Sequence, residues 1–209
     1  MLDICANCGQ YRPDKTINPN GPFAICPECG HRNPFRMLPL FIVAGASGAG
    51  KTAVCRRLTG ALEAVVALDE DILWRPEFNT PADGYRDFHE TWLRLAATIA
   101  QSGRPVLLFG AGAGVPGNIE PCVWRRYFSA VHYLALVCDD AALAERLVAR
   151  PAWRGAQAPG FIAGQQQFNQ WFREYRDEQP PMLRVDTTRS DEDSTGRQVM
   201  AWVSERLAA

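Results

Sequence analysis

A glycine-rich segment between an apolar run and a helix-forming stretch constrains the fold of this chain most strongly. Residues 40–44 are wholly apolar and predict a buried strand, and the next eight residues have the spacing G-x4-G-K-T. Glycines let successive backbone N–H groups turn toward one anion, and the N-terminus of the following helix adds partial positive charge. The segment predicts a phosphate-binding loop (P-loop) made of Gly45, Ala46, Ser47, Gly48, Ala49, Gly50, Lys51 and Thr52.

The chain has 22 basic residues, of which only Lys15 and Lys51 are lysines. Lys51 occupies the loop position from which a flexible ammonium group can reach the β- and γ-phosphates of a nucleotide, and the Thr52 hydroxyl can ligate magnesium. The alternative is a glycine-rich turn with an exposed lysine. Lys15 is predicted to be an ordinary loop residue.

The composition sets the broad class. The 209 residues, 47% of them hydrophobic, can bury a sizeable core, and a net charge of -1 argues against a wholly basic nucleic-acid coat protein. The chain has no apolar run of about 20 residues and starts without a signal segment. We therefore expect a soluble, cytoplasmic protein with no membrane partner.

From Leu40 onward, short apolar runs alternate with longer helical stretches, which predicts parallel βαβ units. The expected strands cover 40–44, 64–68, 105–109, 132–137 and 182–185, and the expected helices cover 51 to about 62, 87–102, 121–128, 139–150, 161–177 and 191–207. This pattern predicts an α/β/α arrangement of three layers around a five-stranded, mainly parallel sheet.

The first 36 residues contain two C-x2-C pairs separated by 17 residues. Each short turn can aim two sulfurs at one ion, and two such turns complete a tetrahedron, so we predict a structural zinc site at Cys5, Cys8, Cys26 and Cys29. Two disulfides or four free thiols are the alternatives. We expect a zinc-ribbon-like module at 1–36 and a P-loop domain at 37–209, with Cys55, Cys122 and Cys138 as buried free thiols.

Two carboxylates follow the second expected strand. Asp69 and Asp71 form a D-x-D pattern at the carboxyl end of that strand, where open parallel sheets bind ligands. A helix N-terminal cap is the alternative role for these residues.

With these motifs, residues 40–209 resemble the small P-loop kinases of metabolites and nucleosides, such as shikimate, gluconate and nucleoside kinases and the chloramphenicol phosphotransferases. The resemblance implies ATP-dependent transfer of the γ-phosphoryl group to a hydroxyl of a small-molecule or nucleoside-like acceptor. Lys51 would stabilise the phosphates, Thr52 and Asp69 would position magnesium, and Asp71 would act as the base. The roles of the two aspartates could also be exchanged.

The resemblance extends to a strand followed by a helix with the pattern R-L-x2-R and a lid with arginines. It implies that Arg150 and Arg154 close over the transferred phosphate, that Arg146 either packs nearby or touches the adenine side, and that Thr187 lies near the base. Ordinary solvated arginines, and a turn at Thr187, are the alternatives.

The acceptor is expected beside residues 73–86 and the glycine-rich loop 110–118, whereas His89 is predicted to be structural. Two other functions stay open: an RNA such as tRNA could be the acceptor, docked by the ribbon, or the chain could be a non-catalytic, nucleotide-gated module that binds a protein.

Overall fold

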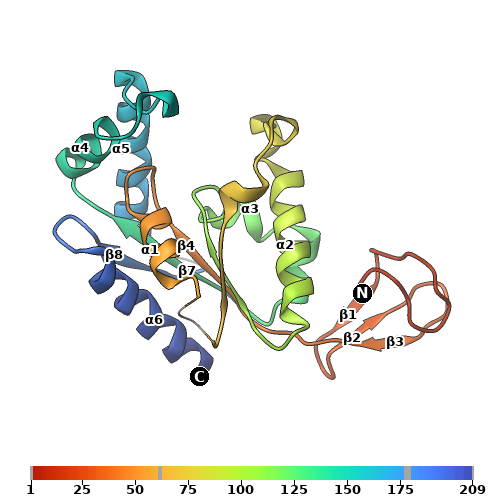
Figure 1. Cartoon of the computed structure of the whole chain (residues 1–209). Helices are drawn as coiled ribbons and strands as arrows, with labels where there is room; N and C mark the ends of the chain where they lie inside the picture. The colour runs from red at the N-terminus through yellow and green to blue at the C-terminus, as the bar shows by residue number, and fades with distance from the viewer. Residues whose placement is uncertain (1, 61–62, 177–179, 209) are drawn as a thin grey trace.

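The computed structural model describes residues 2–60, 63–176 and 180–208. A five-stranded sheet has the order β5-β6-β4-β7-β8, and all its neighbouring strands are parallel. Helices α1, α4, α5 and α6 and the helices between β5 and β7 surround it (Figure 1). The strands are β4 (Leu40–Ala44), β5 (Val66–Asp69), β6 (Val106–Phe109), β7 (Val131–Val137) and β8 (Met182–Asp186). The predicted three-layer class is confirmed.

Helices cover both faces of the sheet because the strands are apolar on both faces. Phe41 and Val43 of β4 face the cluster that includes α1 (Lys51–Leu58) and α6 (Glu192–Ala208), whereas Leu40 and Ile42 face the cluster that includes α2 (Arg86–Ala100). Figure 1 shows α1 and α6 on one side of the sheet and α2 on the other. This alternation is the period of two that a strand imposes on its side chains.

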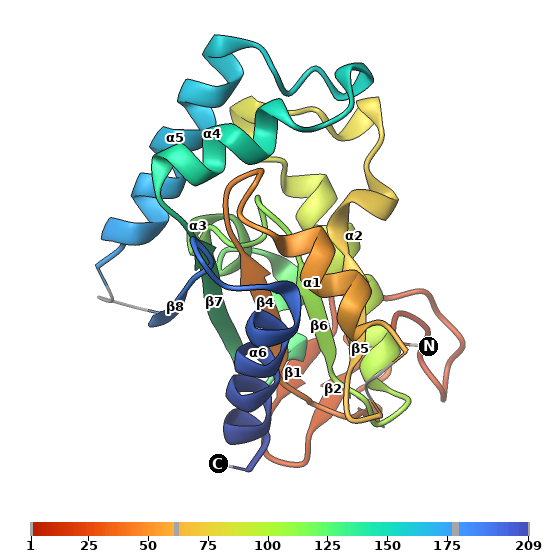
Figure 2. The same ribbon diagram turned by 60° about the vertical axis from the view of Figure 1, so that its left-hand side comes forward.

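The helices α4 (Asp140–Val148) and α5 (Pro159–Glu174) pack on each other beyond the carboxyl ends of the strands, close to the P-loop (Figure 2). A short 3-10 helix, η5 (Ala152–Arg154), lies in the connection between them. Ala46 of the P-loop belongs to the same small apolar cluster as Leu143 and Leu147 of α4. Helix α4 is thus joined to the P-loop by apolar packing.

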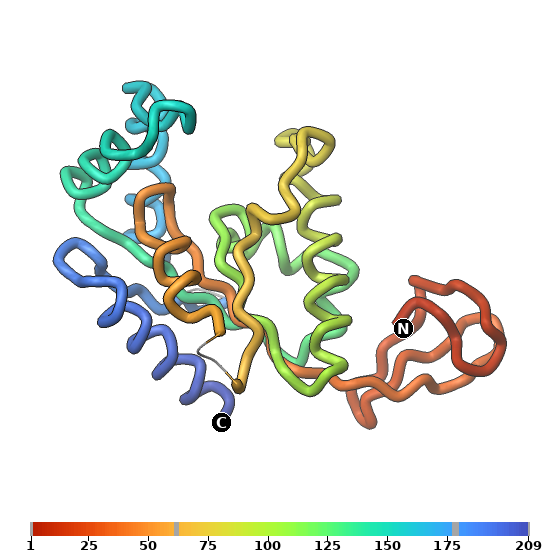
Figure 3. Tube along the Cα trace, viewed as in Figure 1, coloured from red at the N-terminus to blue at the C-terminus, as the bar shows by residue number. Residues whose placement is uncertain are grey.

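The N-terminal residues form an antiparallel sheet of β1 (Thr16–Asn18), β2 (Phe23–Ile25) and β3 (Arg32–Pro34), which stands beside α2 (Figure 3). The Asp3 carboxylate accepts hydrogen bonds from Arg94 of α2, the shorter at 2.6 Å. Lys15 is fully buried, and its Nζ donates to the carbonyl of Leu2 at 2.7 Å. The prediction of an ordinary loop lysine was wrong, because the side chain is buried and carbonyl groups near the N-terminus, of Leu2 and Ile4, accept its hydrogen bonds.

Several boundaries differ from the expectation. Helix α1 ends at Leu58, where Thr59 adopts an extended conformation, and residues 61–62 lie outside the described residues. The expected helix at 121–128 is a 3-10 helix, η4 (Val123–Tyr127), and a short α3 (Pro116–Ile119) precedes it. Helix α5 ends at Glu174, and residue 177 is not described. Among the described residues, no helix is long and apolar enough to cross a membrane.

Candidate functional site

The P-loop joins β4 to α1 in a conformation that requires glycine. Gly45 has φ +144°, and an added Cβ would lie 2.5 Å from the carbonyl oxygen of Leu136 in β7. Gly50 has φ +104° and directly precedes the first residue of α1. The loop therefore presents its backbone at the N-terminus of an eight-residue helix, where an anion is favoured.

Lys51 is held inside this loop. Its Nζ donates hydrogen bonds to the carbonyl oxygens of Gly45, at 2.7 Å, and Ala46, at 3.1 Å. Burial lowers the pKa of the Lys51 ammonium, and the carboxylates of Glu70, Asp71 and Asp69 oppose that effect. A phosphate brought to the loop would supply a further counter-charge to this lysine.

The acidic residues after β5 are tied to the start of α1. The Thr52 hydroxyl donates to the Asp69 carboxylate at 3.0 Å, and the other oxygen of Asp69 accepts the backbone N–H of Asp71, also at 3.0 Å. Asp69 is thus the N-cap of the 3-10 helix η1 (Glu70–Leu73), so the capping role weighed from the sequence applies to it. Burial, followed by repulsion from Asp69, raises the pKa of Asp71.

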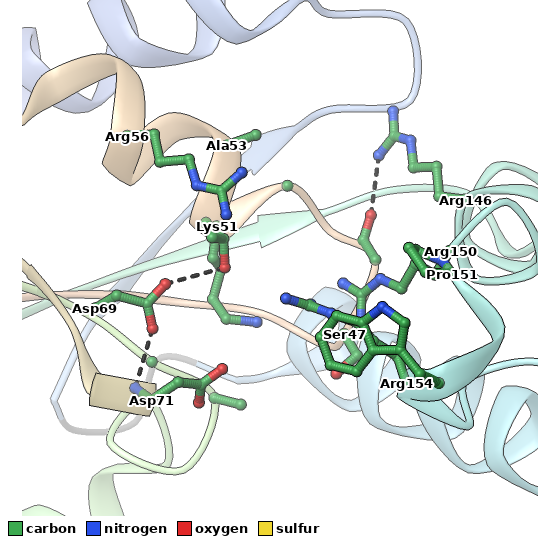
Figure 4. A pocket seen from close by; sticks show the side chains of 16 residues that line it. Ser47, Lys51, Ala53, Arg56, Asp69, Asp71, Arg146, Arg150, Pro151 and Arg154 are labelled. Carbon is green, nitrogen blue, oxygen red and sulfur yellow. Dashed lines mark hydrogen bonds between the residues drawn. The ribbon is translucent and has the colours of Figure 1, made fainter. Parts of the chain in front are cut away.

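These groups surround a cavity of about 470 Å³. Figure 4 shows Asp69 and Asp71 on one side of it, Arg146, Arg150 and Arg154 on the other, and Lys51 between them. Burial and then the neighbouring Arg154 lower the pKa of Arg150. The residues that line the cavity are Ser47, Gly48, Gly50, Lys51, Thr52, Ala53, Arg56, Asp69, Asp71, Gly110, Ala111, Arg146, Arg150, Pro151, Trp153 and Arg154.

Some of the predicted nucleotide-binding residues, among them Ala46, Ala49 and Thr187, do not line this cavity. Ala46 and Ala49 are buried, and Thr187 is buried in an adjoining cavity of about 390 Å³ that Ala49, Gly50 and Arg146 also line. The Thr187 hydroxyl donates to the carbonyl of Ala49 at 3.0 Å and accepts a hydrogen bond from Arg146 at 3.1 Å. Thr187 therefore holds the P-loop backbone at Ala49, and Arg146 holds Thr187 in place.

A carboxylate that we did not single out positions the second glycine-rich loop. Glu70 is 5% exposed, and its oxygens accept the backbone N–H groups of Ala111, Gly112 and Ala113. Burial raises the pKa of Glu70 to about 7, although these hydrogen bonds and Lys51 act in the opposite direction. Glu70 thus holds the loop after β6 against the end of β5.

A second cavity, of about 440 Å³, opens beside Asp71. It is lined by Glu70, Asp71, Trp74, Asn79, Tyr85, Phe88, His89, Gly112, Val115, Asn118 and Phe168. Residues of both segments expected beside the acceptor, 73–86 and 110–118, line this cavity. Arg75 does not line it and stacks on Phe78, with its guanidinium carbon 4.6 Å from the ring centre.

The four N-terminal cysteines converge. Their sulfurs all lie within 4.8 Å of one another, with Cys5 and Cys29 at 3.7 Å and Cys8 and Cys26 at 3.8 Å. Four Zn–S bonds of about 2.3 Å at tetrahedral angles put the sulfurs about 3.8 Å apart. The cluster therefore has the dimensions of a zinc site. Outside the cluster, Cys55, Cys122 and Cys138 are buried free thiols, as predicted.

Sequence reasoning missed Arg56 and Trp153, which line the P-loop cavity, and Glu70, which lines the second cavity. Arg56 was among the arginines set aside, yet it lies four residues after Thr52, and that spacing places both on one face of α1. Trp153 stands next to a predicted lid arginine and is 80% exposed. Glu70 had no distinguishing signal, because its partners are about 41 residues away.

The parallel sheet, the P-loop and the arginine-bearing connection between α4 and α5 define a P-loop α/β protein of kinase-like fold. Residues 40–175 match the AAA domain family designated AAA_33, and the chain belongs to that family. A search of curated proteins finds no match.

Solved structures share the fold at low sequence identity. A gluconokinase from Sinorhizobium meliloti 1021 superimposes with a TM-score of 0.55 at 20% identity, over 83% of this chain and 97% of that one. The Mycobacterium tuberculosis APS kinase CysC, in complex with AMPPNP and APS, gives 0.54 at 18% identity, over 82% and 99%. The Deinococcus radiodurans tunicamycin resistance protein gives 0.52 at 13% identity, over 80% and 96%.

Proposed function

We propose that this protein is an ATP-dependent kinase that transfers the γ-phosphoryl group to a hydroxyl of a small molecule. The observation that carries the proposal is the position of Asp71, which lies in the wall of both the P-loop cavity and the second cavity. A carboxylate between a phosphate site and an acceptor site is where phosphoryl transfer needs its base.

In this mechanism the acceptor oxygen forms a bond to the γ-phosphorus as the bond from that phosphorus to the β-phosphate oxygen breaks. Asp71 takes the hydroxyl proton, and its raised pKa favours that transfer. Lys51 in the middle of the cavity and Arg150 and Arg154 on one side of it offset the charge on the transferred group.

Magnesium fits the oxygen pair at the start of α1. The Thr52 hydroxyl and the Asp69 carboxylate are already 3.0 Å apart, and both are oxygen donors of the kind that magnesium prefers. Bound there with the nucleotide, the ion would neutralise phosphate charge. Asp69 is then the metal-side carboxylate and Asp71 the acceptor-side carboxylate.

The test is ADP formation from ATP and Mg²⁺ with a panel of hydroxyl acceptors. We expect Lys51→Ala and Asp71→Asn to reduce acceptor-dependent turnover at least a hundredfold, with Asp71→Asn retaining binding of a fluorescent ATP analogue. Asp87→Asn, an exposed carboxylate of α2, is the matched control and should leave turnover unchanged. Full activity of Lys51→Ala would refute the assignment.

For the N-terminal residues we propose a structural zinc module at 1–36 beside the P-loop domain at 37–209. The sulfur spacing supports it. The three-stranded sheet is short, and its Ala24 packs into the core cluster that includes α2 rather than into a core of its own, so a metal would add stability to the module. An RNA or protein partner of this module remains a prediction from its sequence.

A further inference from the structure

The described residues that line the second cavity include the carboxyl groups of Glu70 and Asp71 and no lysine or arginine. Asn79 and Asn118 are neutral amides. A carboxylate, sulfate or phosphate on the acceptor would therefore meet like charge there, and no lysine or arginine of this lining would offset the cost of desolvating it. Lys51, Arg150 and Arg154 line the P-loop cavity, on the other side of Asp71. The cavity favours a neutral acceptor.

Aromatic side chains make up most of the remaining wall. Trp74 contacts Phe88 edge-on, with ring centres 5.2 Å apart, and Tyr85 lies 6.0 Å from Trp74. Phe168 contributes from α5. Trp74 is 46% exposed, so part of its ring is available to a ligand. Flat rings such as nucleobases stack on aromatic faces of this kind.

His89 supplies the polar feature of this wall. It is 1% exposed and lines the cavity from α2, and neither Nδ1 nor Nε2 has a hydrogen-bond partner within residues 2–60, 63–176 and 180–208. Gly112 sits beside it, where an added Cβ would come within 3.2 Å of Cε1. Burial lowers the pKa of His89 to about 4, so the ring is neutral at pH 7 and offers one donor and one acceptor. A buried polar group without a partner destabilises the protein unless a ligand supplies the missing hydrogen bonds.

We propose that the second cavity binds a neutral nucleoside, whose base stacks on the aromatic wall and hydrogen-bonds to His89 while a sugar hydroxyl faces Asp71. The identification of this nucleoside as the acceptor rests on the proposed kinase function, whereas its binding does not. His89 is then a residue that determines specificity, because its donor and acceptor match the heteroatom edge of a base.

The test is calorimetric titration of the full chain, loaded with Mg²⁺ and a non-hydrolysable ATP analogue. The probes are the four common ribonucleosides and their deoxy forms, with gluconate and shikimate as anionic alcohols. We expect at least one nucleoside to bind and both anions to fail. His89→Ala should weaken that binding about tenfold or more, His89→Gln should restore part of it, and His31→Ala is the matched control.

Each outcome bears on one proposal or the other. A nucleoside that binds through His89 but yields no ADP with ATP supports the cavity assignment and overturns the kinase function. ADP formation with gluconate or shikimate, and none with nucleosides, supports the kinase function and overturns the nucleoside proposal. Absence of nucleoside binding, or binding unchanged in a folded His89→Ala protein, also overturns it.

Discussion

The Glu70 carboxylate accepts the backbone N–H of Gly112 at 3.1 Å, and this bond joins the end of β5 to the loop that follows β6. The same carboxylate accepts the N–H groups of Ala111 and Ala113, while the Glu70 carbonyl accepts the indole N–H of Trp92 at 3.2 Å. One side chain thus positions a wall shared by the two cavities, since Gly112 lines one and Ala111 the other.

Replacing Glu70 by alanine should destabilise the protein by about 1–3 kcal/mol, because buried N–H groups would lose their acceptor. Urea denaturation followed by circular dichroism measures this change. Glu77→Ala is the control, since Glu77 is exposed and its ion pair with Arg75 is long, at 3.9 Å. Equal midpoints for the two variants would contradict the clamp role of Glu70.

The pH dependence of stability should contain two opposing contributions. The pKa of Glu70 is raised from 4.5 to about 7, so the native state holds more protons in that window and stability falls as pH rises. The pKa of His89 is lowered from 6.5 to about 4, so the unfolded state holds more protons there and stability falls as pH drops. Each contribution is at most about 3 kcal/mol.

Variants separate the two contributions. Relative to the wild-type slope between pH 4.5 and 6.5, Glu70→Gln should make stability rise more steeply with pH, and His89→Asn should make it fall. Urea midpoints across this range give both slopes. Three parallel curves would show that neither group titrates with the pKa assigned to it.

Gly114 packs its backbone against the end of β4. An added Cβ would lie 2.0 Å from the Cβ of Ala44, which is fully buried in the central strand and cannot move aside. Gly114→Ala should therefore cost about 1–3 kcal/mol of stability. Gly117→Ala, where an added Cβ has no atom within 4 Å, should be nearly neutral, and a similar loss in both variants would argue against close packing as the cause.

Metal removal should act on the N-terminal module. We expect one zinc per chain by mass spectrometry of the purified protein, little or none in Cys26→Ser, and an unchanged content in Cys55→Ala, whose thiol is buried apart from the cluster. Chelation should lower the melting temperature of the wild-type protein. A metal-free protein that melts at the same temperature with and without chelator would overturn the zinc assignment.

The amino-acid sequence was sufficient for features encoded over a few residues. The P-loop, the D-x-D pair and the C-x2-C pairs each depend on spacing within one turn or strand end, and the apolar runs identified every strand of the large sheet. The predicted helix ends were less accurate, because residues such as Thr59 are compatible with either a helical or an extended backbone.

Tertiary structure decided the rest, because the deciding contacts join residues far apart in the chain. Lys15 looked like a loop lysine until carbonyls 11 and 13 residues away closed around it. His89 is predicted to be structural, and only the fold shows that it lines a cavity beside Gly112 and that both ring nitrogens lack a hydrogen-bond partner among the described residues. The sequence alone predicted a phosphate-binding loop, whereas only the fold placed Asp71 in the wall of two cavities. Local spacing encodes a backbone conformation, but a cavity is enclosed by whichever distant segments pack around it.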